Sequence, residues 1–209
     1  MTSSVLRGLV PGFALAIAAA CVQAAPSSSE LVTGSVPRAG WLCCNMRASH
    51  LWLGDRDWIS DGNYRFEGAM LVPLGTPMVV MGWLPDKPYD VHLLLAGQPF
   101  ELGNDYSRDV PPEQFVKRYL ATTDPAVRLA AFAPEIRQSI QASRIRIGMT
   151  REQVFMALGM PIVSMNARDD APYLRYWTHR TGEFWITFAN DRVTRVDTDT
   201  TTRAEVLDE

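Results

Sequence analysis

The chain has 209 residues, of which 47% are hydrophobic and 21% are charged, and its formal net charge is −3. These values are typical of a folded protein with one or two domains and a core of ordinary size. No basic patch stands out, so we expect no nucleic-acid partner.

Residues 1–24 have the pattern of a signal segment. Arg7 gives a weakly positive start, and residues 8–22 form an almost wholly apolar stretch that is short for a membrane span. We therefore expect an exported protein that resides in the periplasm.

Two processing sites compete at the end of this segment. Residues 22–24 before Ala25 suit ordinary signal cleavage, whereas Cys21 after Ala-Ala-Ala forms a degenerate lipoprotein box. The sequence leaves open whether the mature protein is free in the periplasm or is attached to a membrane through a lipid on Cys21. Residues 25–35 are expected to form a flexible tether in either case.

Residues 36–106 are expected to form a small antiparallel β meander or barrel, because short apolar runs alternate with turn residues. The candidate strand segments lie at residues 40–46, 68–73, 78–83, 89–95 and 99–102, with a turn flanked by aromatic residues at 58–64. In one of them Tyr89, Val91, Leu93 and Leu95 share a face. The succession of strands around a Gly-Thr-Pro turn is similar to a bacterial SH3-like barrel.

Cys43 and Cys44 are adjacent. A disulfide between neighbours is strained and rare, although an oxidising compartment permits it. Because side chains alternate along a strand, we expect instead two thiols on opposite faces, one of them buried. A further alternative is a nucleophilic thiol with His50 as its base. We favour structural thiols over this alternative.

Residues 107–133 are expected to be a helical connector. Proline-led starts at residues 111–113 and 124–125 suit first helical turns. The apolar face of the first helix would comprise Phe115, Val116, Tyr119 and Leu120. Pro134 would begin another helix that carries Ile136 and Ile140 on one face.

The sequence of residues 145–161 predicts one short helix, with capping residues at its start and a glycine and a proline at its end. Thr150 suits the N-cap, and Gln153 is placed to complete a capping box with it. Met149 and Val154 are placed to form a hydrophobic staple.

The end of this helix is specified by a glycine and a proline. Gly159 after the apolar Leu158 suits a left-handed position, and Pro161 prevents continuation. The motif as a whole comprises Gly148, Met149, Thr150, Gln153, Val154, Leu158, Gly159 and Pro161.

Three strand candidates follow, at residues 173–179, 184–188 and 192–196. In the middle one, alternation places Phe184, Ile186 and Phe188 on one face and Trp185 and Thr187 on the other. Trp185 has two interpretations: a core residue beneath a second domain, which we slightly favour, or an exposed anchor on a docking face.

The Ile-x-Ile-Gly-Met-Thr start, the Gln-Val pair and the Leu-Gly-x-Pro stop, followed by three strands, resemble the signature of the SmpA/OmlA family. These are the BamE-like small lipoproteins of the bacterial outer membrane. The resemblance covers roughly residues 136–198 and implies a domain at 134–198 with two helices and a three-stranded antiparallel sheet. It also implies an outer-membrane location, a role in outer-membrane integrity or outer-membrane protein assembly, and envelope proteins as partners.

The chain departs from this family by its long additional N-terminal part. We expect an α+β fold overall, in which residues 199–209, polar and rich in threonine, form a frayed tail.

The sequence contains no metal-ligand spacing, nucleophile elbow or phosphate-binding loop, so we expect no metal, cofactor or catalytic residues. The leading hypothesis is a non-catalytic envelope protein that acts as an interaction module. The alternatives are a cell-wall or ligand-binding module that binds peptidoglycan through residues 36–106, and a thiol enzyme centred on Cys43 and Cys44.

Overall fold

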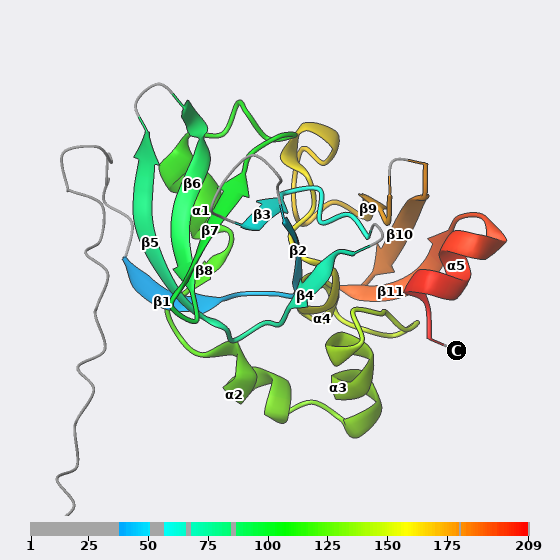
Figure 1. The fold of residues 1–209 in the computed structure, drawn as a ribbon. Helices are drawn as coiled ribbons and strands as arrows, with labels where there is room; N and C mark the ends of the chain where they lie inside the picture. Colours follow the sequence, from blue (N-terminus) through cyan, green and yellow to red (C-terminus); the bar gives the residue numbers. More distant parts are fainter. Residues whose placement is uncertain (1–37, 51–56, 66–67, 85–86, 180, 209) are drawn as a thin grey trace, which may run out of the picture.

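The structure is a computed structural model that describes residues 38–50, 57–65, 68–84, 87–179 and 181–208. It has an α+β fold, as the sequence predicts, with a curled sheet of eight strands and a separate antiparallel sheet of three strands (Figure 1). Among these residues no helix is both long and apolar enough to cross a membrane. The predicted signal segment and tether, with Cys21, lie outside the described residues.

The larger sheet has the strand order β4-β2-β3-β7-β6-β5-β1-β8. Its neighbouring strands are antiparallel except for β3 and β7, which run parallel. The strands are β1 (Ala39–Leu42), β2 (Met46–His50), β3 (Asp57–Ser60), β4 (Met70–Val72), β5 (Pro77–Leu84), β6 (Lys87–Leu95), β7 (Gln98–Gly103) and β8 (Leu120–Ala121).

The core of this β-rich unit follows the alternation seen in the sequence. Val91, Leu93 and Leu95 of β6 are buried, as predicted, and face the buried side chains of the neighbouring strands. Tyr89 was assigned to the same face but is 45% exposed. The period-2 pattern therefore identifies the core face of the strand without showing where along the strand the core ends.

Two boundaries within and beside this unit were wrong. The segment at 40–46 is not one strand, because β1 ends at Leu42 and β2 begins at Met46. The connector at 107–133 is not wholly helical: α1 (Pro112–Lys117) and α2 (Pro125–Ala130) flank the short strand β8, which pairs with β1. Leu120 is buried, but in this strand and not on a helix face. Tertiary pairing with a distant strand overrode the local helical pattern.

The second unit has the two helices and three strands that the sequence predicts. They are α3 (Pro134–Gln141), α4 (Arg151–Leu158), β9 (Tyr173–Trp177), β10 (Glu183–Ala189) and β11 (Arg192–Asp197), with a short 3-10 turn at Val163–Met165. The sheet order is β11-β10-β9.

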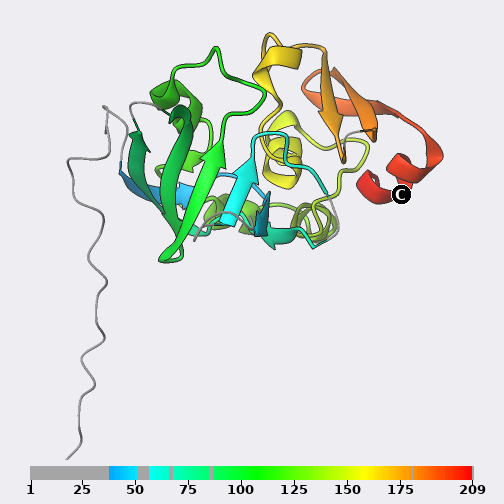
Figure 2. The same ribbon diagram turned by 45° about the horizontal axis from the view of Figure 1, so that its top comes forward.

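The core of the second unit lies between the helices and one face of its sheet. Phe184, Ile186 and Phe188 are buried there, as predicted. The buried side chains of α4 join the same core. Figure 2 shows α4 between the two sheets, so this helix is in a position to connect both units.

The C-terminal segment is not frayed, and this prediction was wrong. Residues Thr200–Val206 form the helix α5, capped by the carboxylate of Asp199, which accepts a hydrogen bond from the Thr202 backbone N–H at 3.0 Å. Leu207 pairs with Ile145 in a parallel bridge, and both are buried. The polar composition of this segment does not indicate that Val206 and Leu207 are buried. Leu207 is paired with Ile145, about sixty residues earlier in the chain.

Candidate binding groove at the Cys43–Cys44 disulfide

An open cavity of about 790 Å³ lies between α2, α4 and the connection from β1 to β2. Its lining is predominantly apolar. The apolar lining includes Cys43, Cys44, Val127, Ala131, Phe155 and Met160. We call this cavity the disulfide groove.

The floor of the groove is a disulfide between Cys43 and Cys44. Our expectation of two free thiols was wrong, because it treated these residues as part of a strand. They lie instead in the connection between β1 and β2, where the alternation of side chains does not apply. Bonded to each other, the two sulfur atoms do not provide the thiolate that a thiol enzyme needs.

The disulfide is held in place by the chain on either side of it. The Cys43 N–H donates to the Tyr119 carbonyl at 2.9 Å, and the Asn45 N–H donates to the Met156 carbonyl of α4 at 3.0 Å. Cys44 is buried in the hydrophobic core of the β-rich unit, whereas Cys43 is half-buried and packs against that core. The connection between the strands therefore crosses α4 with the disulfide at the crossing point.

Asn45, the residue after the disulfide, links the β-rich unit to the helices of the second unit. Its side chain is buried, accepts a hydrogen bond from the Leu74 N–H at 3.0 Å and donates to the Ile140 carbonyl at 2.5 Å. A buried amide whose donor and acceptor are both matched fixes the geometry around it. The floor of the groove is consequently anchored to α3 as well as to α4.

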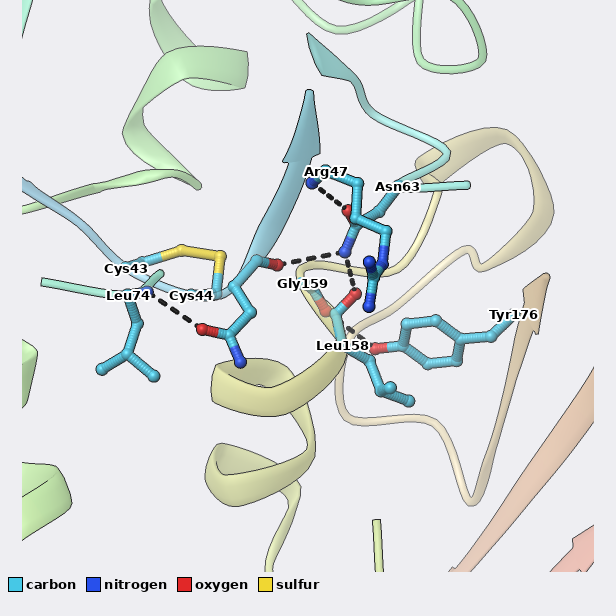
Figure 3. The surroundings of a disulfide bond; sticks show 9 residues. Cys43, Cys44, Arg47, Asn63, Leu74, Leu158, Gly159 and Tyr176 are labelled. Carbon is cyan, nitrogen blue, oxygen red and sulfur yellow. Dashed lines mark hydrogen bonds between the residues drawn. A yellow bond between two sulfur atoms is a disulfide. The ribbon is translucent and has the colours of Figure 1, made fainter. Parts of the chain in front are cut away.

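A second asparagine supports the same crossing. The Asn63 side-chain amide donates to the Asn45 carbonyl at 3.0 Å and to the Leu158 carbonyl at 2.6 Å, and its oxygen accepts from the Arg47 N–H at 2.7 Å (Figure 3). The end of α4 thus meets the β-rich unit at Asn63, a residue that the sequence pattern shows only as a turn.

The helix motif has the predicted geometry and a further role. The Thr150 hydroxyl accepts from the Gln153 N–H at 3.3 Å and the Gln153 side chain accepts from the Thr150 N–H at 2.8 Å, which confirms the capping box. Gly159 has φ 84° and ends the helix. A Cβ at Gly159 would lie 2.9 Å from the Asn63 amide nitrogen and 3.0 Å from the Met46 sulfur, so the glycine also permits the two units to approach.

The remaining motif residues support the helix from both sides. Met149, Val154 and Leu158 are buried in the second core, and Gly148 has φ 89°. Pro161 follows the helix, and its carbonyl accepts a hydrogen bond from the Arg118 guanidinium at 2.9 Å. None of these residues lines the groove, so the motif is structural.

Two ion pairs stand at the rim of the groove. Arg128 of α2 makes two hydrogen bonds of 2.9 Å to the carboxylate of Glu152 on α4. Arg151 lies 3.1 Å from Asp191 and 4.0 Å above the ring of Phe188. The first pair joins the two helical walls. Asp124, the remaining charged residue of the lining, accepts a hydrogen bond from the Ala126 N–H at 2.8 Å.

The predicted docking face, with Trp185 and Thr187, lies elsewhere, on the outer face of the small sheet. The Trp185 side chain is half-buried, so it is neither the buried core residue nor the fully exposed anchor of the two interpretations. Its ring N–H donates to Glu183 at 2.7 Å, and the Arg175 guanidinium lies 4.7 Å from the Trp177 ring and 5.4 Å from the Trp185 ring.

The groove residues of α2 and α4 gave only a weak sequence signal. Phe155 of α4 is half-buried and lines the groove. Val127 of α2, which also lines the groove, is 69% exposed. Exposed apolar residues at helical spacing were the available clue, and it does not distinguish a core face from a binding face.

Among the described residues no cluster of three or more histidine, cysteine or acidic side chains could hold a metal ion. Comparisons of the chain with protein-family models, with curated proteins and with solved structures find no match. The fold and the groove define an α+β protein in which two units share an apolar cavity over a disulfide.

Proposed function

We propose that this chain is an exported cell-envelope protein that acts as a non-catalytic interaction module similar to the SmpA/OmlA proteins. The export pattern at residues 1–24 and the helix motif at 145–161 support this proposal. On this basis the protein acts in the periplasm, at the outer membrane if Cys21 carries a lipid. Its role would be in outer-membrane integrity or in outer-membrane protein assembly, with envelope proteins as partners.

The disulfide groove is the observation that carries the proposal. No residue of α2 is buried, and Val127 exposes 69% of its surface beside an apolar cavity. Apolar surface left in water costs about 25 cal/mol per Å², and exposed apolar patches therefore mark interaction sites. A partner that covers the groove would recover this free energy.

The charges of the rim indicate what kind of partner would fit. Arg128 is paired with Glu152, Arg151 with Asp191, and the Asp124 carboxylate accepts from the Ala126 N–H, so each charged side chain of the lining has a partner within the chain and an apolar occupant needs no charge of its own. We infer that the occupant is an apolar segment of an envelope protein, whose side chains enter between α2 and α4. Binding of this kind depends weakly on salt.

Site-specific crosslinking in intact envelopes tests this function. A photo-reactive amino acid at position 127 of the full-length protein should capture an envelope protein. The same group at position 98, at the exposed start of β7, serves as the matched control and should not. Mass spectrometry of the captured band then identifies the partner.

A blocking variant separates binding in the groove from chance proximity. Ala131 is exposed and lines the groove, so Ala131→Trp should fill the cavity without disturbing a core. We expect it to abolish the crosslink from position 127 while the melting temperature stays unchanged. Crosslinks that persist in this variant, or that are equally strong from position 98, would overturn the proposal.

A further inference from the structure

A second cavity, of about 540 Å³, lies on the β-rich unit beside the loop after β9. Three aromatic rings line it: Trp58 of β3, Tyr64 in the turn that follows, and Tyr106 after β7. Arg47, Ser60, Asp105 and His179 supply the polar part of the lining. We call this cavity the aromatic pocket. It is separate from the disulfide groove, with which it shares no lining residue.

The aromatic rings are fixed in position by glycines. A Cβ at Gly103 would lie 1.9 Å from the ring of Trp58, so the indole rests directly on the Gly103 backbone. A Cβ at Gly62 would lie 2.9 Å from the Tyr64 ring, which in turn meets the Tyr106 ring edge to face at 5.7 Å. Rings packed against backbone in this way form a rigid surface that loses little conformational entropy on binding.

The imidazole of His179, which also lines the pocket, packs closely against a glycine as well. A Cβ at Gly182 would lie 2.6 Å from the Nε2 atom of His179, and the Nδ1 atom of the ring lies 3.1 Å from the Thr181 hydroxyl. The pocket is therefore completed by the C-terminal unit. An isolated fragment of residues 36–106 would lack this wall.

The polar groups of the pocket are arranged beside the rings. The Ser60 hydroxyl donates to the Asp105 carboxylate at 3.0 Å and accepts from the Gly62 N–H at 3.2 Å. Behind them the buried Asp61 carboxylate accepts from the Tyr106 N–H at 3.2 and 3.3 Å, which sets the course of the loop. Asp105 and Arg47 bring opposite charges to one cavity.

This combination restricts the chemistry of a ligand. A wholly apolar ligand would desolvate Arg47, Ser60 and Asp105 without replacing their hydrogen bonds, at a cost of about 1–3 kcal/mol for each unmatched group. A cation would be repelled by Arg47 and attracted by Asp105, and an anion the reverse, so the two side chains together favour no net charge in a ligand. A ring with apolar faces and polar edges matches both parts of the lining.

We propose that the aromatic pocket binds a neutral saccharide residue. The C–H face of the sugar ring would stack on Trp58 or Tyr106, and its hydroxyl or amide groups would bond to Asp105, Ser60 and Arg47. On this proposal the protein would be a glycan-binding module in addition to an interaction module, and the pocket would lie partly in the β-rich region for which peptidoglycan binding was one of the alternative hypotheses. The inference does not depend on the disulfide groove being occupied.

Calorimetric titration and saturation-transfer NMR of the full-length protein test the proposal. The probes are the tetramer of N-acetylglucosamine and, as a second neutral saccharide, maltotetraose. We expect at least one of them to bind with a dissociation constant below about 1 mM, and to receive saturation from aromatic protons. Binding of neither probe at 5 mM would overturn the proposal.

Matched variants locate the site. Tyr106→Ala removes a ring of the pocket, whereas Tyr173→Ala removes a ring that is 55% exposed on the outer face of the small sheet. We expect Tyr106→Ala to weaken binding at least tenfold and Tyr173→Ala to leave it unchanged. Equal effects of the two variants would place the saccharide elsewhere and overturn the assignment.

A second variant covers the case in which Tyr106→Ala fails to fold. Asp105→Asn keeps the shape of the side chain, and the Ser60 hydroxyl can still donate to the amide oxygen. We expect it to weaken binding at least threefold with an unchanged melting temperature. Affinity equal to that of the parent protein would show that the polar edge of the pocket does not recognise the ligand.

Discussion

The contact between Gly159 and Asn63 yields the sharpest test of how the two units are joined. Gly159 combines φ 84° with ψ 177°, a conformation essentially restricted to glycine. Gly159→Ala therefore introduces backbone strain of about 1–3 kcal/mol. The new methyl group would also displace the Asn63 amide, which lies 2.9 Å from the position of its carbon atom.

Displacing that amide has a predictable cost. The Asn63 nitrogen donates to the carbonyls of Asn45 and Leu158, and each of these hydrogen bonds contributes about 0.5–1.5 kcal/mol. Together with the strain, we expect Gly159→Ala to lower the free energy of unfolding by about 2–6 kcal/mol. Urea unfolding followed by far-UV circular dichroism measures this loss.

Two control variants separate the cost of backbone strain at Gly159 from the cost of displacing the Asn63 amide. Gly148 also has a positive φ, of 89°, but a Cβ there would meet nothing within 4 Å, so Gly148→Ala should cost strain alone. In an Asn63→Ala background the amide is already absent, and Gly159→Ala should then cost about 1–3 kcal/mol less. Strict additivity of the Gly159 and Asn63 changes would refute the reasoning.

Three further predictions concern other parts of the molecule. In thermal melts, Trp185→Ala should lower the free energy of unfolding by less than about 2 kcal/mol, because the side chain is half-buried, whereas Phe184→Ala should lower it by about 3–5 kcal/mol, because Phe184 is fully buried. Equal losses in the two variants would show that Trp185 is core. Burial raises the pKa of Asp61 to about 6, above its unfolded value near 4. The folded state then binds more protons between these values, so stability should fall as the pH rises from about 4 to 6, and Asp61→Asn should flatten that slope. Reducing the Cys43–Cys44 disulfide should change the unfolding free energy by only about 1 kcal/mol, because a link between adjacent residues closes a minimal loop; a loss above about 3 kcal/mol would contradict the entropic argument.

The second unit could be predicted from the sequence because its signals are local. The cap at Thr150, the alternation of Phe184, Ile186 and Phe188, and the turns between the strands each depend on residues a few positions apart. The structure has each of these features where the sequence placed it. Short-range periodicity and capping chemistry specify such elements well.

The errors arose wherever a distant partner decided the outcome. Leu120 forms a strand because β1 pairs with it, and Leu207 is buried because Ile145 lies beside it. The alternation of a strand does not apply to Cys43 and Cys44, because the chain leaves β1 at Leu42 and crosses α4 before β2 begins at Met46. No pattern within ten residues of these positions contains that information.

The two candidate sites could not be predicted from the sequence for the same reason, because each combines residues that are far apart along the chain. The disulfide groove combines residues near positions 43, 127 and 155, and the aromatic pocket combines residues near 47, 58, 105 and 179. Each set is chemically ordinary until the fold brings its members together. Gly103 of β7 is informative in this respect, because a Cβ there would overlap the ring of Trp58, which lies far away in the sequence. A glycine outside any turn or helix end is thus a sign that another part of the chain approaches closely, and in this protein the part that approaches Gly103 is a wall of the aromatic pocket.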